Sequence, residues 1–180
     1  MAIGTKDEWT DDEWVVKRSK EEMLADYADF TDRVKAILNC VKNADVWALF
    51  HHKPARTFYQ TKPRICLIGD AAHATTPHQG VGAGMCIEDS YVLSELLGKI
   101  SSADELEKAF HAYQEVRRPR VKRLIESSQE AGWLWDLEGP EGNDFEAFER
   151  NATTRLHWIW SHDVRTDVER AQEMMAIQPM

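Results

Sequence analysis

The chain has 180 residues, with 31 acidic and 22 basic side chains, a formal net charge of −9 and a pI near 5.3. Hydrophobic residues make up 43% and charged residues 29%, a globular composition that excludes a disordered tail, a collagen-like fibre and a disulfide-stapled mini-protein. The acidic balance argues against nucleic acid or an anionic membrane as a partner, because phosphate groups favour a basic surface. Three cysteines without a C-x-x-C pair indicate a reduced, cytoplasmic setting. No apolar stretch has the length of a signal peptide core or a membrane span.

The first third of the chain predicts a short strand followed by a long helix. Two Asp-Glu-Trp triplets, at residues 7–9 and 12–14, are interpreted as an acidic turn beside a strand at Val15-Val16. Ser19-Lys20-Glu21-Glu22 forms a capping box, which marks a helix start. Apolar residues then recur at steps of three and four and predict one helix of about five turns with a stripe facing the core. The stripe consists of Met23, Tyr27, Phe30, Val34, Ile37 and Val41.

The remainder predicts a strand or two in residues 46–63, one buried strand and several helices. Residues 64–68 form a continuous apolar run, typical of a strand buried on both faces. Helices are predicted from Met85 to Ile100 and, after a second capping box at residues 102–105, up to an interruption at Pro119. A further helix runs toward Trp135, residues 136–144 form an acidic loop, and the tail is helical, with Trp158 and Trp160 sealing a core edge. The fold class predicted is a helix-rich α/β fold.

The segment from Gly69 to Gly84 joins the predicted buried strand to a helix, the place where open α/β sheets bind ligands. Asp70 would present a carboxylate that accepts hydrogen bonds from sugar-like hydroxyls. Glycines at 80, 82 and 84 let the backbone approach a flat ligand, and the first helical N–H groups favour negative charge. The spacing is not the dinucleotide fingerprint G-x-G-x-x-G, and a tight connection that merely permits close packing is the alternative.

The full string resembles the second flavin-binding motif of FAD-dependent aromatic hydroxylases of the p-hydroxybenzoate hydroxylase type, and most of all their salicylate hydroxylase-like branch. The matching residues are Ile68-Gly69-Asp70-Ala71-Ala72-His73, Pro77, the glycines from Gly80 to Gly84, and Glu88-Asp89. Matches flank the motif at Trp47-Ala48-Leu49-Phe50, Pro54 and Tyr59 upstream, and at Tyr113 and Arg117-Arg118-Pro119-Arg120 downstream. The resemblance extends over about residues 9–165.

The resemblance implies a site and a reaction. Asp70 would contact the ribityl chain of FAD and Pro77 would lie beside the isoalloxazine ring. The backbone amides of Gly82, Ala83 and Gly84 would lie near the flavin N1 and the C2 carbonyl, and Gly80 is a further cofactor-binding residue of the motif. The implied reaction uses NAD(P)H to reduce FAD and O2 to hydroxylate a salicylate- or phenol-like ring. The resemblance assigns no catalytic side chain in this chain.

The resemblance also implies the architecture: the C-terminal part of a Rossmann-like FAD/NAD(P)-binding monooxygenase fold together with the end of a substrate-domain sheet. Residues 1–60 would end the substrate domain, residues 61–135 would hold the second FAD-binding segment, and residues 136–180 would form a helical tail. The family's G-x-G-x-x-G unit and its central Asp-Gly motif are absent from the sequence. We therefore expect a C-terminal portion of an enzyme, with weak or no FAD retention and no turnover. The alternatives are a non-catalytic binding module and another flavoprotein reaction, such as that of an epoxidase, a reductase or a halogenase.

No functional role is predicted for the other candidate residues. His73 is expected to make a local hydrogen bond within its loop. His51-His52 and the His157/His162 pair lack metal-ligand spacing, so no metal site is predicted. Ser90 and Ser94 lack the G-x-S-x-G elbow of a hydrolase. The cluster of Arg117, Arg118 and Arg120 is expected to pair with acidic neighbours at a helix end.

Overall fold

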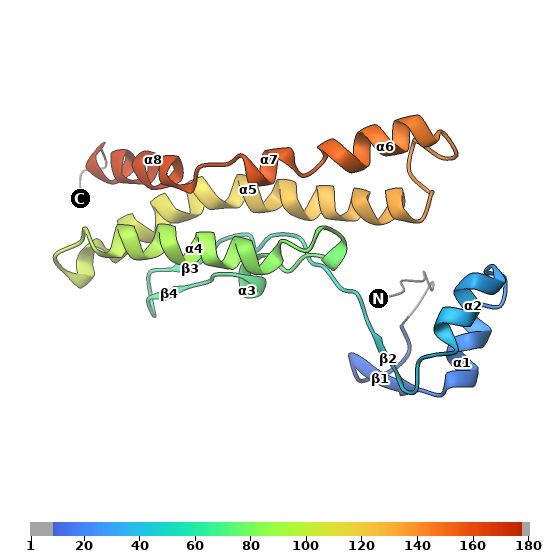
Figure 1. Ribbon diagram of the computed structural model, residues 1–180. Helices are drawn as coiled ribbons and strands as arrows, with labels where there is room; N and C mark the ends of the chain where they lie inside the picture. The colour runs from blue at the N-terminus through green and yellow to red at the C-terminus, as the bar shows by residue number, and fades with distance from the viewer. Residues whose placement is uncertain (1–8, 178–180) are drawn as a thin grey trace. The chain divides into compact units, whose positions relative to one another are not determined.

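A computed structural model describes residues 9–177 and divides the chain into two compact units, with the boundary between Leu49 and Phe50. Figure 1 shows the elements of both units. The three-part functional division at residues 60 and 135 stays a prediction. None of the described helices has the combination of length and apolar character needed to cross a membrane.

The first unit pairs two strands and places two short helices between them in the sequence. Strand β1 (Val15–Arg18) runs antiparallel to β2 (Ala44–Trp47). The bend at residues 12–14 agrees with the predicted acidic turn, whereas Asp7 and Glu8 of the first triplet lie outside the described residues. The predicted capping box is confirmed, because Ser19 and Glu22 cap each other's backbone at the start of helix α1 (Lys20–Asp26).

The single five-turn helix predicted after the capping box is wrong. The chain forms α1 and a separate helix α2 (Asp32–Leu38), with Thr31 at the second N-cap. Aspartate and threonine are frequent between residues 26 and 32, and their side chains compete with helical backbone bonding. The predicted core stripe is also wrong in part, since Phe30 and Ile37 are exposed and Leu38 is the buried position.

The second unit begins with a hairpin rather than a buried strand. Strand β3 (Tyr59–Gln60) pairs antiparallel with β4 (Ile65–Cys66), and the amide of Leu67 donates to the carbonyl of Phe58. The prediction of a strand buried on both faces is wrong here, because Ile65 is half exposed. Within the described residues β4 pairs with β3 alone, so it belongs to a two-stranded hairpin and is not a central strand.

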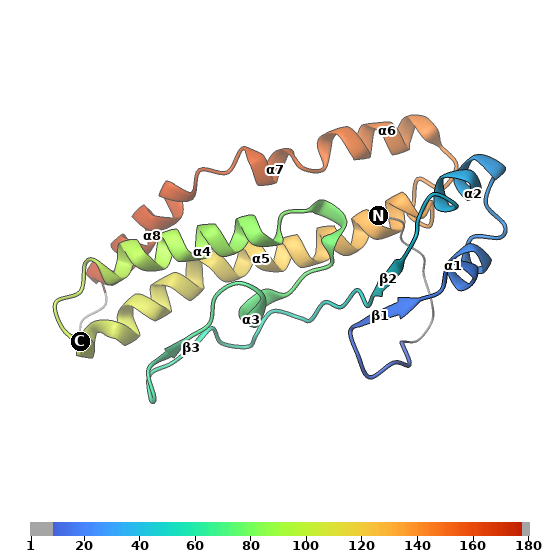
Figure 2. The same cartoon turned by 60° about the horizontal axis from the view of Figure 1, so that its bottom comes forward.

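Helices form the rest of the second unit, and α4, α5 and α8 pack together around its core (Figures 1 and 2). In chain order they are α3 (Asp70–His73), the 3-10 turn η1 (Pro77–Gln79), α4 (Gly82–Leu97), η2 (Ala103–Glu105), α5 (Leu106–Trp135), α6 (Phe145–Thr154), α7 (His157–Trp160) and α8 (Val164–Ile177). The core is made of aliphatic and aromatic side chains from these helices, including Val92, Leu96, Tyr113, Val121, Leu124 and Ala171, together with Phe58 from the loop before β3. The predicted helix-rich character is therefore confirmed, as is the second capping box at Ser102 and Glu105.

Two details of the helices differ from the predictions. Helix α5 continues through Pro119, although an interruption was predicted there. Pro119 lies on the exposed side, so water can bind the carbonyl of Glu115 that the missing N–H leaves free. Trp158 is half-buried against helix α5, as predicted, but Trp160 is 69% exposed and seals no core edge.

Candidate flavin-binding site

The glycine-rich segment, which runs from the end of β4 into the first turn of α4 (residues 69–84), contains all of the predicted site residues. Asp70 is the first residue of α3 and is exposed, and Pro77 is the first residue of η1 and is also exposed. Gly80 ends η1 in the left-handed conformation, with φ 67° and ψ 20°. Residues 82–84 form the first turn of α4. The structure thus places the predicted residues at the start of α3, at the two ends of η1 and at the start of α4.

Gly69 fixes the direction in which the chain enters α3. Its φ of 56° and ψ of −143° belong to a region that residues with a Cβ rarely adopt. A Cβ on Gly69 would lie 2.9 Å from Sγ of Cys86. The amide of Gly69 donates to Oδ2 of Asp89 at 3.0 Å. The start of α3 is therefore held directly against α4, close to the first turn of that helix.

The N-terminus of α4 has backbone donors without a cap. Its N-cap residue Val81 offers no side-chain acceptor, so the first amides of the helix, at residues 82–84, have no intrahelical or capping partner among residues 9–177. Gly84 is exposed, and a Cβ added there would meet no atom within 4 Å. A planar ligand with carbonyl or anionic edges fits this surface, because the amides and the positive end of the helix dipole favour such groups.

Two side-chain atoms in the same segment are buried without a hydrogen-bond partner among the described residues: Oγ1 of Thr75 and Nδ1 of His78. Burial lowers the pKa of His78, although the charge of Asp136 acts in the opposite direction. The imidazole is therefore neutral at neutral pH, and Gly132 of α5 leaves the space that its ring occupies. Sequence reasoning missed both residues, and their position on either side of Pro77 in the motif was the available signal.

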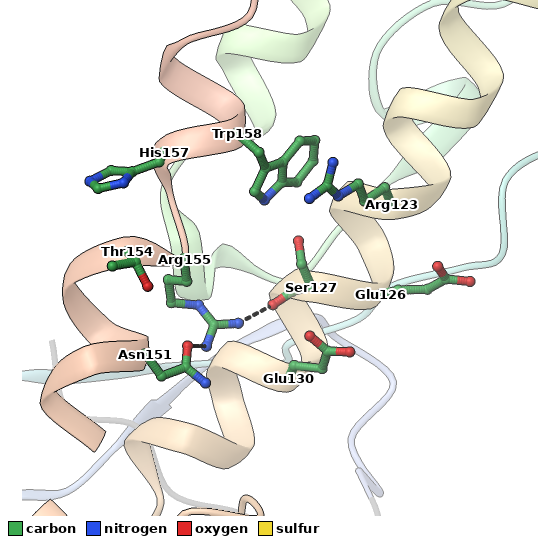
Figure 3. A pocket seen from close by; sticks show the side chains of 9 residues that line it. All are labelled: Arg123, Glu126, Ser127, Glu130, Asn151, Thr154, Arg155, His157 and Trp158. Carbon is green, nitrogen blue, oxygen red and sulfur yellow. Dashed lines mark hydrogen bonds between the residues drawn. The ribbon is translucent and has the colours of Figure 1, made fainter. Parts of the chain in front are cut away.

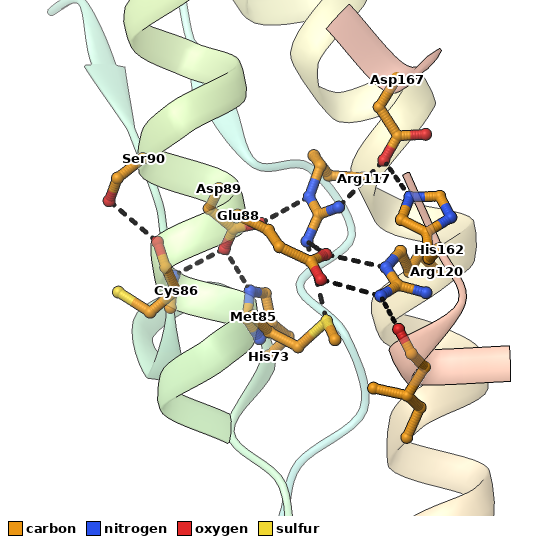
Figure 4. A network of polar contacts seen from close by, with 12 residues as sticks. His73, Met85, Cys86, Glu88, Asp89, Ser90, Arg117, Arg120, His162 and Asp167 are labelled. Atoms are coloured by element: carbon orange, nitrogen blue, oxygen red, sulfur yellow. Dashed lines mark hydrogen bonds and ion pairs between the residues drawn. The ribbon is translucent and has the colours of Figure 1, made fainter. Parts of the chain in front are cut away.

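A buried polar network connects the segment to α4, α5 and α8, and its partners at His73 and Asp89 were missed by sequence reasoning (Figure 4). Nε2 of His73 lies 2.5 Å from Oδ2 of Asp89, so the partner of His73 is on α4 and not in its own loop as predicted. Arg117 is fully buried, and its Nε donates to Oδ1 of Asp89 at 2.8 Å. Its two other nitrogens pair with Glu88 at 2.8 Å and Asp167 at 3.0 Å.

Arg120 completes this network by binding both carboxylate oxygens of Glu88 at 2.8 Å. The prediction that the arginine cluster pairs with acidic residues is confirmed for Arg117 and Arg120. Their predicted place at a helix end is wrong, since both lie in the middle of α5. Arginines within an apolar helical stripe beside Tyr113 and Val116 were the sequence signal for buried partners.

The hollow in Figure 3 lies between α5 and the helices α6 and α7, away from the glycine-rich segment in the sequence. Its volume is about 470 Å³, and it is lined by Arg123, Glu126, Ser127, Glu130, Asn151, Thr154, Arg155, His157 and Trp158. Arg155 donates to the carbonyl of Ser127 at 2.7 Å and to Oδ1 of Asn151 at 2.9 Å, which fixes its side chain. Because two arginines face two glutamates, the lining has no net preference for an anion or a cation.

The remaining candidates have structural roles. Hydroxyls of Ser90 and Ser94 donate to carbonyls of their own helix, so neither is an exposed nucleophile elbow. His162 binds Asp167 at 2.9 Å, and His52 lies 3.0 Å from the carbonyl of Asp70. Across residues 9–177, the His, Cys, Asp and Glu side chains form no cluster that could hold a metal ion.

Comparison with known proteins agrees with this geometry. A family model described as an FAD binding domain matches residues 8–128. Two salicylate hydroxylases from Pseudomonas putida are 40% and 39% identical to the chain and cover 88% and 90% of it, but the matched parts are 37% of each relative. A solved salicylate hydroxylase substrate complex superposes with a TM-score of 0.84 and 34% identity, over 97% of this chain and 42% of that one.

CtdE in complex with FAD and a substrate has the same fold, with a TM-score of 0.74 at 21% identity. The predicted class, a helix-rich part of a FAD-dependent monooxygenase fold, is thereby confirmed. The chain spans about two fifths of the length of the relatives that it matches. Since the family model covers more than half of the chain, the chain belongs to the FAD-binding domain family.

Proposed function

We propose that this chain supplies the flavin-contacting segment of a cytoplasmic, FAD-dependent and NAD(P)H-consuming monooxygenase that hydroxylates a salicylate- or phenol-like substrate. The observation that carries the proposal is the uncapped start of α4 at residues 82–84, held against the turn that bears Asp70. The relatives named salicylate hydroxylase support the substrate class. The three cysteines are free thiols, in keeping with a reducing compartment.

Each site residue would have a defined task. The exposed carboxylate of Asp70 would accept hydrogen bonds from ribityl hydroxyls, and the ring of Pro77 would pack against the isoalloxazine plane. The fixed amides of residues 82–84 would favour negative charge on a bound group without reorganising. When bound, FAD supplies the redox chemistry through which NAD(P)H and O2 are consumed.

An FAD titration of the full chain, followed by flavin fluorescence, tests the cofactor assignment. We expect Asp70→Ala to weaken binding about tenfold, which equals about 1.4 kcal/mol and is typical of a lost charged hydrogen bond. Asp104→Ala is the matched control, because Asp104 is an exposed carboxylate of η2 whose partner, Arg64, lies 3.8 Å away. Equal FAD affinity in the wild type and Asp70→Ala would contradict the assignment.

NAD(P)H oxidation by the FAD-loaded chain, measured with and without salicylate, tests the reaction. Oxidation that rises with salicylate and yields a hydroxylated product supports a hydroxylase. FAD binding without oxidation or product is the result expected of a C-terminal portion, and it does not distinguish the hydroxylase from the non-catalytic binding module.

A further inference from the structure

The buried network beneath the glycine-rich segment joins the start of α3 to three helices. Asp89 has no exposed side-chain surface, and its Oδ2 accepts from the amide of Gly69 at 3.0 Å and lies 2.5 Å from Nε2 of His73. These two contacts lie on either side of Asp70 in the sequence, one residue before it and three residues after it. One carboxylate therefore ties down both ends of the short helix that carries Asp70.

Asp89 itself is held by Arg117. The Nε of Arg117 donates to Oδ1 of Asp89 at 2.8 Å, opposite the oxygen that faces the turn (Figure 4). Burial alone would raise the pKa of Asp89, but the hydrogen bond with His73 and the charge of Arg117 lower it. A carboxylate buried in this way stays charged because a guanidinium, also fully buried, pairs with it.

The C-terminal helix completes the same network. Asp167 of α8 accepts from Nη1 of Arg117 at 3.0 Å and is 3% exposed. Arg117 thus holds α8 and the turn at once, through the two carboxylates of Asp167 and Asp89. The orientation of Arg117 that suits Asp89 therefore depends on a carboxylate 50 residues further along the chain.

We propose that Asp89 and Arg117 are positioning residues for the cofactor site, which set the orientation of the Asp70 carboxylate toward the ribityl chain without touching the cofactor. The proposal rests on the function proposed above and adds to it the residues that hold the site in shape. Gly69 and Asp89 act together, because the glycine permits the turn and the buried carboxylate fixes it.

A double-mutant cycle between Asp70 and Asp89 tests this, with FAD affinity as the readout. We expect Asp89→Asn to weaken FAD binding about tenfold in the presence of Asp70 and less than about twofold in the Asp70→Ala background. A general loss of structure would weaken binding by the same factor in both backgrounds, and that result, or an unchanged affinity, would overturn the proposal. Asp104→Asn is the matched control and should leave FAD affinity unchanged.

Hydrogen exchange of the same proteins without FAD gives an independent readout. We expect Asp89→Asn to accelerate amide exchange in residues 69–74 at least about fivefold, with exchange in the core of α5 unchanged. Unchanged exchange at the turn would overturn the proposal. A wild-type chain that retains no FAD agrees with the weak retention expected of a C-terminal portion, and hydrogen exchange alone then decides whether Asp89 holds the turn.

If Asp89→Asn does not fold, Asp167→Asn takes its place in both measurements. It removes one carboxylate at the far side of Arg117 and leaves Asp89 intact. We expect a loss of FAD affinity of about threefold that again disappears in the Asp70→Ala background. An Asp167→Asn variant that is folded but changes neither the affinity nor the exchange would overturn the proposal for Arg117.

Discussion

The substitution Gly69→Ala tests whether the turn before α3 depends on a glycine for two separate reasons. The φ of 56° with ψ of −143° is unfavourable for alanine by about 1–3 kcal/mol. The new Cβ would also lie 2.9 Å from Sγ and 3.3 Å from Cβ of Cys86, an overpacking that costs about 1–3 kcal/mol. Together the two effects predict a fall of about 2–6 kcal/mol in the free energy of unfolding.

Gly80→Ala is the matched control, because Gly80 has a φ of 67° in the left-handed region and a Cβ there would meet no atom within 4 Å. We expect it to lose about 1–2 kcal/mol from backbone strain alone. The assay is urea unfolding followed by circular dichroism, with the double variant Gly69→Ala/Cys86→Ala alongside. Removing Sγ should restore part of the loss, about 1 kcal/mol or more. A Gly69→Ala variant as stable as Gly80→Ala would refute the reasoning.

Three further predictions concern thiols, acid and the core. Burial, and to a smaller extent the charge of Asp89, raises the pKa of Cys66 to about 12. A thiol-reactive dye at pH 8 should therefore label the exposed Cys40 much faster than Cys66, and equal labelling rates would contradict the structure. Folding lowers the pKa of Glu88 from 4.5 and the pKa of Asp89 from 3.8. The two carboxylates therefore stabilise the fold fully above these values, and the contribution is lost as the pH falls through the folded-state pKa values. The urea midpoint should decline less steeply between pH 6 and pH 3 in Glu88→Gln than in the wild type. Leu124→Ala should lower the free energy of unfolding by about 2–5 kcal/mol, because the side chain is fully buried; a loss below about 1 kcal/mol by urea unfolding would place Leu124 outside the core.

Local signals in the sequence identified features that depend on neighbours close in the chain. Both capping boxes form as predicted, because Ser19 with Glu22 and Ser102 with Glu105 need one helical turn alone. The helix that begins at Gly82 was located by its apolar spacing. The Gly-Asp-Ala-Ala-His string pointed to a flavin-binding family, and it lies within residues 8–128, which the family model matches.

Predictions failed where the outcome depended on packing. Whether residues 64–68 form a buried central strand depends on neighbouring strands, and β4 has one partner among the described residues. Whether Pro119 breaks a helix depends on solvent and on the packing of the flanking turns, and here Val116 and Val121 hold both sides of α5 in the core. Residue propensities give the local preference alone. Packing outweighs that preference at Pro119, and the number of strand partners decides the outcome at residues 64–68.

The sequence by itself determined the acidic, globular character of the chain, its helix-rich class and the position of the flavin motif. These follow from composition, periodicity and a contiguous string of residues. Tertiary structure alone decided that Asp89, Arg117 and Asp167 meet, because they come from three helices and are separated by 28 and 50 residues. The apolar stripe around Arg117 indicates a buried partner for this arginine, but only packing decides which carboxylates lose their water and pair with it.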